Sequence, residues 1–316
     1  MEGNIDIYCE LGFIDQFCNS CPPSKNGIPD KHYKSWQKYL DLLCGQSDVV
    51  LMDITTKEYS NYCDDSIRGQ IFDILLKSHF DGNGNLICLP EEQKNMEIKI
   101  KDDEGKEYFN QHEHAIFLMN GDKSMCTTME EDYGLLFISP ETMYERAEFL
   151  FTPQRNIINE TTNNWEFVRN YRLPYNSILL IDNFILSKDY KDIEKNFISL
   201  FNALLPDKLN KNCAHISILT EIPKKQDEKW ANEKKTKIEE LIKSVRNYSI
   251  EVTIKYTKNE NHDRNLITNY HLFDCGYGFV LSDLERRKGT KLTAFPITHP
   301  STLLIIQQLK EKFRIE

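Results

Sequence analysis

Three acidic residues in the N-terminal half lie at or near the ends of short apolar runs that predict buried strands. Glu10 ends the run in "IYCELGF", Asp122 follows "AIFLMNG", and Glu58 comes shortly after "SDVVLMDI". The carboxyl ends of parallel strands meet at one edge of a sheet, where ligands gather. Carboxylate oxygens suit Mg²⁺ or Mn²⁺, and such an ion activates water for attack on a phosphodiester. The spacing therefore predicts a catalytic metal site formed by Glu10, Glu58 and Asp122.

Two alternatives remain open for these acids. Asp6 competes with Glu10 if the register of the first strand differs. An acidic residue at a strand end is also most often a solvated loop residue or a helix cap. The ordered trio, rather than any single acid, favours the metal site.

A second polar set lies in the C-terminal half, in the stretch "NENHDRNLITNY". It has the form His-x-Arg-x4-Asn, and the arginine in it can donate two hydrogen bonds to a phosphate. The stretch "ERRKGTK" adds cations without any pattern for reading bases, so binding to nucleic acid should be largely independent of base sequence. The candidates for binding phosphate are His262, Arg264, Asn269, Arg286, Arg287 and Lys288. The simpler alternative is a local charge network around His262–Arg264.

Alternating strand and helix patterns predict an α/β fold built from two domains with mainly parallel sheets. Residues 1–150 form the first, acidic domain, residues 151–176 form a junction rich in Asn, Thr and Arg, and residues 177–316 form the second domain. Strands are predicted in 4–10, 47–54, 114–119, 135–139, 177–186, 214–221 and 250–257, with further strand pieces in 268–283. Helices are predicted in 30–45, 55–80, 124–134, 190–206, 227–247 and 302–313.

Composition and charge bound the class of protein. The chain has 316 residues, of which 40% are hydrophobic, and a net charge of −10. Residues 1–150 carry 13 basic and 28 acidic side chains, a net −15, whereas residues 151–316 carry a net +5. No apolar run is long enough to span a membrane, and the acidic N-terminus lacks the features of a secretory signal. We expect a cytoplasmic protein without membrane contact, in which the basic half attracts phosphate or a partner of opposite charge.

Nine cysteines are scattered along the chain. An odd, unclustered set is typical of reduced thiols rather than of a disulfide framework. Cys18 and Cys21 form a single C-x-x-C, and a zinc site would need a second pair at a suitable spacing. We therefore expect ordinary thiols at these positions.

The N-terminal half resembles the PIN family of nucleases over roughly residues 4–145. The phrase "IYCELGFI" matches the family's first strand, with Glu10 in place of the usual Asp and Gly12 in place of the usual Asn. "TTKEY" supplies Glu58, "NGDKS" supplies Asp122, and "EEDYGLLFISPET" follows the family's later course. Ser124 stands where the family has its last acid, and Glu131 or Asp132 are the acids that would compensate. The resemblance implies a metal-dependent nuclease.

The C-terminal half resembles phospholipase D-like domains over roughly residues 177–285, and more closely the degenerate ones that carry "HDR". In active members the His attacks phosphorus, and two copies of the motif are required. Here Arg264 replaces Lys, Asn269 replaces the Asp that would orient His262, and the chain holds one copy. The resemblance implies binding to a phosphate-bearing or protein ligand rather than cleavage.

Together the two resemblances predict a nuclease that uses a carboxylate-held Mg²⁺ or Mn²⁺ to hydrolyse nucleic acid, with RNA expected before DNA. They also suggest an effector of a microbial antiviral or toxin system. One alternative is a catalytically inactive regulatory subunit that binds nucleic acid or a protein partner. The other is a homodimeric phosphodiesterase that uses His262.

Overall fold

A computed structural model describes ten stretches of the chain, and these contain the helices and strands given below. They are residues 5–22, 30–44, 47–65, 69–70, 86–89, 114–159, 161–258, 264–276, 278–281 and 290–314. Four residues of the predicted phosphate site lie outside these stretches: His262, Arg286, Arg287 and Lys288.

The chain divides into two compact units close to the boundary predicted at residue 150. Unit 1 comprises Met1–Glu130 and Leu135–Phe151, and unit 2 comprises Glu131–Gly134 and Thr152–Glu316. The segment 151–176, predicted as a junction, is instead part of unit 2. It supplies the edge strand β6 and a 3-10 helix, and the side chain of Trp165 within it is buried in the core.

Unit 1 contains a five-stranded sheet whose pairings are all parallel. Its strands are β1 (Ile5–Cys9), β2 (Ser47–Thr55), β3 (Leu86–Leu89), β4 (Ile116–Leu118) and β5 (Leu136–Ile138). The strand order is β3-β2-β1-β4-β5, so the chain builds outward in one direction and then returns to build outward in the other. This order creates a topological switch point between β1 and β4, where doubly wound sheets bind their ligands.

Strands β1, β4 and β5 are almost wholly buried, as expected for a parallel sheet whose two faces are covered. All three residues of β4 are buried, and the ring of Phe117 stacks on Tyr8 at 5.2 Å and on Phe137 at 4.8 Å between ring centroids. The helices of this region are α1 (Leu11–Asn19), α2 (Lys31–Cys44), α3 (Thr56–Asp65), α7 (Lys123–Tyr133) and α8 (Met143–Phe151). Packing of aromatic rings across three strands fixes the register of the strands whose ends carry the acids.

Unit 2 contains a seven-stranded sheet in the order β6-β12-β11-β10-β7-β8-β9. Its strands are β6 (Gln154–Ile158), β7 (Ser177–Ile181), β8 (Ala214–Thr220), β9 (Ile250–Tyr256), β10 (Asn265–Thr268), β11 (His271–Cys275) and β12 (Thr290–Pro296). Only β7, β8 and β9 pair in parallel among these described strands, and the other four pairings are antiparallel. The prediction of a mainly parallel second sheet is therefore wrong for this unit.

The reason lies in the length of the connections. Parallel neighbours need a long crossover, and the predicted helices between β7, β8 and β9 provide one. Between β10 and β11 the chain has only Asn269 and Tyr270, and a two-residue connection joins antiparallel strands. The α/β alternation thus holds for residues 177–257 and ends where the tight turn begins.

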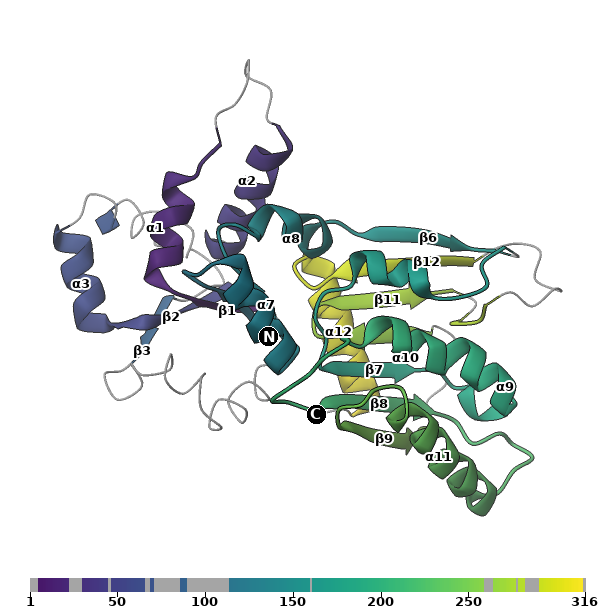
Figure 1. Ribbon diagram of the computed structural model, residues 1–316. Helices are drawn as coiled ribbons and strands as arrows, with labels where there is room; N and C mark the ends of the chain where they lie inside the picture. Colours follow the sequence, from purple (N-terminus) through teal and green to yellow (C-terminus); the bar gives the residue numbers. More distant parts are fainter. Residues whose placement is uncertain are drawn as a thin grey trace. The chain divides into compact units, whose positions relative to one another are not determined.

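The helices of unit 2 follow the right-handed crossover rule, which places α10 and α11 on the same face of the parallel strands (Figure 1). The short helices are η2 (Glu166–Tyr171), η3 (Ile185–Ser187), α9 (Tyr190–Ile193), the π-helical η4 (Glu194–Ile198) and α10 (Ser199–Leu204). The longer helices are α11 (Glu228–Lys243) and α12 (Pro300–Phe313). In the stretches that the structure describes, no helix has both the length and the apolar composition needed to cross a membrane.

Candidate functional site

Glu10 lies at the switch point of the unit 1 sheet. It directly follows β1, its side chain is 6% exposed, and its Oε2 accepts a hydrogen bond from the backbone N–H of Asn120 at 2.5 Å. Asn120 comes shortly after β4, so this bond ties together the carboxyl ends of two neighbouring strands. The sequence predicted Glu10 at a strand end, and the structure places it there.

Gly12 leaves room for this arrangement. A Cβ at position 12 would collide with the side chain of Asn120. The Oδ1 of Asn120 also accepts a hydrogen bond from Nε2 of Gln16 at 2.5 Å. Asn120 therefore occupies the space that a larger residue at position 12 would require, and it approaches α1 closely.

Asp53 is a further acid at this edge that the sequence patterns did not single out. It lies near the carboxyl end of β2, and its Oδ1 accepts a hydrogen bond from the backbone N–H of Leu11 at 2.9 Å. Burial raises the pKa of the nearby Cys9 thiol well above its usual value, and the negative charges of Asp53 and Glu10 raise it further. The negative charges of Asp53 and Glu10, which come from adjacent strands, therefore both act on the thiol of Cys9.

Asp122 follows β4 and is exposed, as expected for a residue at the edge of the sheet. Its Oδ1 accepts a hydrogen bond from the backbone N–H of Met125 at 2.7 Å, which caps the N-terminus of α7. Ser124, at the position where the related family has an acid, is exposed in the first turn of the same helix. Asp122 is thus both a helix cap and a strand-end acid.

Glu58 has a local role. Its Oε2 accepts hydrogen bonds from the backbone N–H of Thr55 at 2.9 Å and from the Thr55 hydroxyl at 3.0 Å. The backbone N–H of Glu58 donates in turn to the Thr55 hydroxyl at 3.3 Å. This reciprocal pair is a capping box, which sets the start of α3.

The three predicted acids do not share one direct coordination site. Among the residues that the structure describes, the carboxylates of Glu10, Glu58 and Asp122 do not form a group whose oxygens all lie within 4.8 Å of one another. Mg²⁺ often keeps several waters and needs only one or two carboxylates. The set Glu10, Asp53 and Asp122, near the carboxyl ends of β1, β2 and β4, does not meet that spacing either, so an ion at this edge would be held by fewer carboxylates and by water.

Glu131 and Asp132 do not compensate for Ser124. They lie at the other end of α7, roughly 12 Å along the helix from its first turn. The carboxylate of Glu131 pairs with Lys208 at 3.1 Å, and that of Asp132 pairs with Lys211 at 2.9 Å. Both acids belong to unit 2 rather than to the acidic edge of unit 1.

Arg264 lies at the corresponding edge of unit 2, where β7 ends and β10 begins. Its guanidinium Nε is 3.7 Å from Oδ2 of Asp182, and its Cζ is 4.8 Å from the ring centroid of Phe184. Burial raises the pKa of Asp182, while the N–H of Phe184 and the charge of Arg264 oppose the rise. This edge therefore holds a cation beside a buried carboxyl group and an exposed aromatic ring.

Two buried polar atoms near the ends of β7 and β8 give further evidence for a ligand near Arg264. Oδ1 of Asn183 and Oγ1 of Thr220 are buried and make no hydrogen bond with any residue that the structure describes. Buried polar atoms in folded proteins nearly always have a partner, so atoms without one point to a ligand or a bound water. Together with Arg264 they mark the carboxyl edge of the parallel strands as a candidate binding site.

Asn269 lies away from Arg264. Strand β10 separates the two residues by roughly 16 Å along the chain. The Oδ1 of Asn269 accepts hydrogen bonds from the backbone N–H groups of Asn176 and Ser177, both at 3.0 Å, and its Nδ2 donates to Oδ1 of Asn176 at 2.8 Å. The side chain of Asn269 thus holds the start of β7, and the structure does not bring it to the phosphate position predicted for it.

Comparison of the sequence with protein-family models and with curated proteins gave no match in either case. The resemblance to PIN nucleases and to phospholipase D-like domains therefore stays an expectation from the motifs.

Proposed function

We propose that unit 1 is a metal-dependent nuclease that hydrolyses single-stranded nucleic acid at the carboxyl edge of its sheet. The observation that carries the proposal is that Glu10, Asp53 and Asp122 lie just before or after the carboxyl ends of three adjacent strands, β1, β2 and β4. Glu10 and Asn120 meet at the switch point of the sheet, where this class of fold binds ligands.

The chemistry of the donors fits Mg²⁺ or Mn²⁺. All three side chains offer hard carboxylate oxygens, which these ions prefer. A bound ion would polarise the phosphodiester and help to ionise the attacking water. The backbone N–H groups of Asn120 and Leu11 hold the carboxylates of Glu10 and Asp53 in fixed orientations, so the site is preorganised by the fold.

We assign binding of the nucleic acid backbone to the Arg264 edge of unit 2. An arginine donor beside an exposed aromatic ring suits a phosphate and a stacked base. The buried polar atoms of Asn183 and Thr220 at the same edge favour a ligand there. Because none of these groups reads base edges in a pattern, we expect recognition largely independent of base sequence.

A second candidate function is that of an inactive regulatory subunit that binds nucleic acid or a protein partner. The capping roles of Glu58 and Asp122 favour it, because each carboxylate has a structural explanation without a metal. The homodimeric phosphodiesterase that would use His262 is the third candidate, and His262 lies outside the described residues.

Cleavage assays on the purified full chain separate the three functions. Single-stranded RNA and DNA are incubated with Mg²⁺ or Mn²⁺ and with wild type, Asp122→Asn and His262→Ala. The Asn variant is chosen because asparagine also caps helix N-termini well, so α7 keeps its cap while the charge is lost. We expect metal-dependent cleavage that Asp122→Asn abolishes and His262→Ala preserves.

The other outcomes contradict this proposal in different ways. Cleavage that is indifferent to chelators and is lost only in His262→Ala supports the dimeric phosphodiesterase. Binding of nucleic acid without cleavage under any metal supports the regulatory subunit. The Glu58→Gln variant serves as a matched control, since glutamine preserves a capping box and the proposal gives Glu58 no catalytic role.

A further inference from the structure

A cysteine, a histidine and a glutamate meet at the amino ends of two strands of unit 2. Cys213 directly precedes β8, and His215 is the second residue of that strand. Residues two apart in extended chain project to the same side, which brings their side chains together. Glu251 lies on the neighbouring strand β9, directly opposite His215 in the parallel register.

The three side chains are in contact in a definite order. Sγ of Cys213 is 3.3 Å from Nε2 of His215, and Nδ1 of His215 is 3.2 Å from Oε2 of Glu251. Each residue offers one ligand atom such that all three atoms lie within 4.8 Å of one another. In the part of the chain that the structure describes, this is the group of three that meets that spacing.

We propose that Cys213, His215 and Glu251 bind a zinc ion, or a transition metal ion of similar softness. Zinc takes cysteine, histidine and carboxylate ligands in tetrahedral geometry. With ordinary zinc–sulfur and zinc–nitrogen distances, two such ligands are roughly 3.5 Å apart, close to the 3.3 Å between Sγ of Cys213 and Nε2 of His215. Nε2 would then be the ligand nitrogen, and the carboxylate of Glu251 would exchange its contact with Nδ1 for one with the ion. On binding, the thiol of Cys213 gives its proton to solvent and coordinates as the thiolate.

The burial of the three ligands suits a site with one open position. Cys213 is 8% exposed, whereas the side chains of His215 and Glu251 are 39% and 66% exposed. Three protein ligands leave the fourth position of a tetrahedral zinc ion for water or an incoming ligand. The ion would therefore be anchored from the protein side by sulfur and reached by solvent from the side of the carboxylate.

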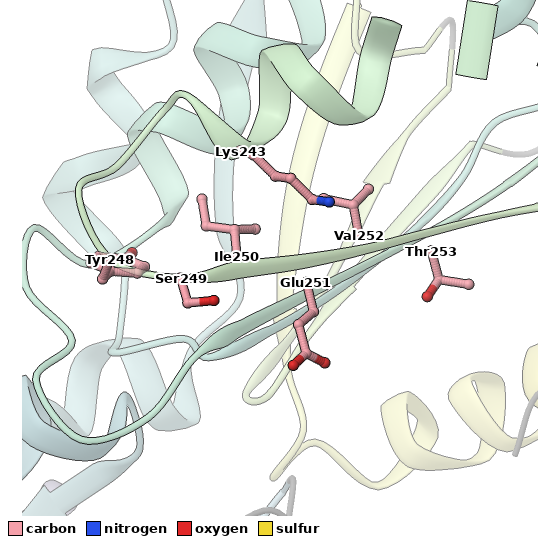
Figure 2. A pocket seen from close by; sticks show the side chains of 7 residues that line it. All are labelled: Lys243, Tyr248, Ser249, Ile250, Glu251, Val252 and Thr253. Carbon is pink, nitrogen blue, oxygen red and sulfur yellow. The ribbon is translucent and has the colours of Figure 1, made fainter. Parts of the chain in front are cut away.

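Glu251 also lines a groove at the edge of the sheet. A groove of about 550 Å³ runs along β9, which is an edge strand, and it is lined by Lys243 and residues 248–253 (Figure 2). The side chain of Glu251 projects from β9 on the side away from Lys243 (Figure 2). Glu251 thus belongs both to the groove and to the ligand group.

This site is separate from the two sites described above. It lies at the amino end of β8, and Thr220 lies at the carboxyl end, roughly 20 Å away along the strand. Its thiolate donor favours zinc over Mg²⁺ and Mn²⁺, which the carboxylate oxygens of unit 1 favour. The zinc site therefore does not depend on whether unit 1 is a nuclease.

Titration of the reduced full chain with Co²⁺, followed by optical absorption, tests the site. Cobalt replaces zinc in such sites, and a cysteine ligand gives a near-ultraviolet charge-transfer band that carboxylates do not give. We expect one equivalent of Co²⁺ to produce this band and zinc to displace it. The band should vanish in Cys213→Ser, and Co²⁺ affinity should fall by about tenfold or more in Glu251→Gln.

The double variant Cys18→Ser/Cys21→Ser is the matched control, because these exposed cysteines of unit 1 form the single C-x-x-C of the chain. Loss of the band in this variant, or its persistence in Cys213→Ser, would assign the cobalt to other thiols and overturn the proposal. Absence of the band in wild type would do the same. Glu251 is mostly exposed, so Glu251→Gln keeps the test valid if Cys213→Ser does not fold.

Discussion

Asn269 is completely buried and joins two parts of unit 2 that are far apart in sequence. Its amide accepts two backbone N–H groups from positions 176 and 177 and returns one hydrogen bond to Asn176. The motif around Asn269 predicted that its side chain binds phosphate. That prediction used only residues close to Asn269 in the sequence. The partners of Asn269 are more than 90 residues away, and only the fold reveals them.

We predict that Asn269→Ala destabilises unit 2 without affecting the acidic edge of unit 1. Loss of the amide removes the acceptor shared by the backbone N–H groups of Asn176 and Ser177, and we expect a cost of about 2–4 kcal/mol in the free energy of unfolding. Hydrogen exchange should speed up at the amides of Asn176 and Ser177 while exchange in β1 stays unchanged. Unchanged exchange at those two amides would contradict the role assigned here.

The side chain of Glu130 is largely buried, with 11% of it exposed. Burial raises its pKa from the usual 4.5 to about 7, while Arg146, whose Nη2 lies 2.6 Å from Oε2, and a backbone N–H oppose the rise. The folded state thus holds the proton more strongly than the unfolded state. Stability is therefore greatest below the unfolded pKa and falls as pH rises through the folded pKa.

We predict that the free energy of unfolding falls by roughly 3 kcal/mol between pH 4.5 and pH 7 on account of Glu130. Glu130→Gln should remove this part of the pH dependence and should stabilise the protein at pH 8 relative to wild type. Urea unfolding at several pH values measures both effects. The exposed Glu148→Gln is the control, and an unchanged slope in Glu130→Gln would contradict the prediction.

The strand-to-helix connections of unit 1 carry both the structural caps and the candidate site. The sequence predicted these elements because apolar runs alternate with polar helical stretches. The structure shows that Thr55 holds the capping box at the start of α3. The sequence did not distinguish an acid that caps a helix from one that faces the sheet edge, because both follow a strand.

Asp53 is an acid at the sheet edge that the sequence pattern did not identify. It lies inside the run 47–54 and reads as an interruption of a buried strand, so the pattern gives it no function. Its role depends on Leu11, which follows the end of β1. The backbone N–H of Leu11 donates a hydrogen bond to Oδ1 of Asp53. Only the parallel pairing of β1 and β2 brings the two together.

At this scale we predict different results for two substitutions of Glu58. Glu58→Ala removes both hydrogen bonds to Thr55 and should destabilise unit 1 by about 1 kcal/mol. Glu58→Gln preserves the capping box and should change neither stability nor cleavage. Thermal unfolding and the nuclease assay measure the two properties, and a loss of cleavage in Glu58→Gln would return Glu58 to the metal site.

The whole chain combines an acidic unit with a basic one. The net charge is −15 in residues 1–150 and +5 in residues 151–316, and the structure divides the chain into two units close to residue 150. The strand order of unit 1 and the antiparallel half of the second sheet were not foretold. They depend on pairing between distant segments, which local periodicity does not encode.

We predict that nucleic acid binding depends on salt and that Arg264 contributes one phosphate contact. In the presence of chelator, Arg264→Gln should weaken binding of a short single-stranded RNA. The slope of log affinity against log salt should fall in magnitude by about 0.7. Lys229→Gln, an exposed cation of α11, removes the same charge and should leave the slope unchanged. Equal effects of the two substitutions would show that Arg264 acts only through net charge.

The rate of single-stranded RNA cleavage by Asp53→Asn over a Mn²⁺ titration tests the central claim most directly. Asparagine keeps the acceptor for the N–H of Leu11, so the fold is retained and only the charge is lost. We expect the rate to fall by more than about 100-fold, about 3 kcal/mol in the barrier, with partial recovery at high Mn²⁺. Wild-type cleavage rates in Asp53→Asn, at every Mn²⁺ concentration, would contradict a metal site at this edge of the sheet.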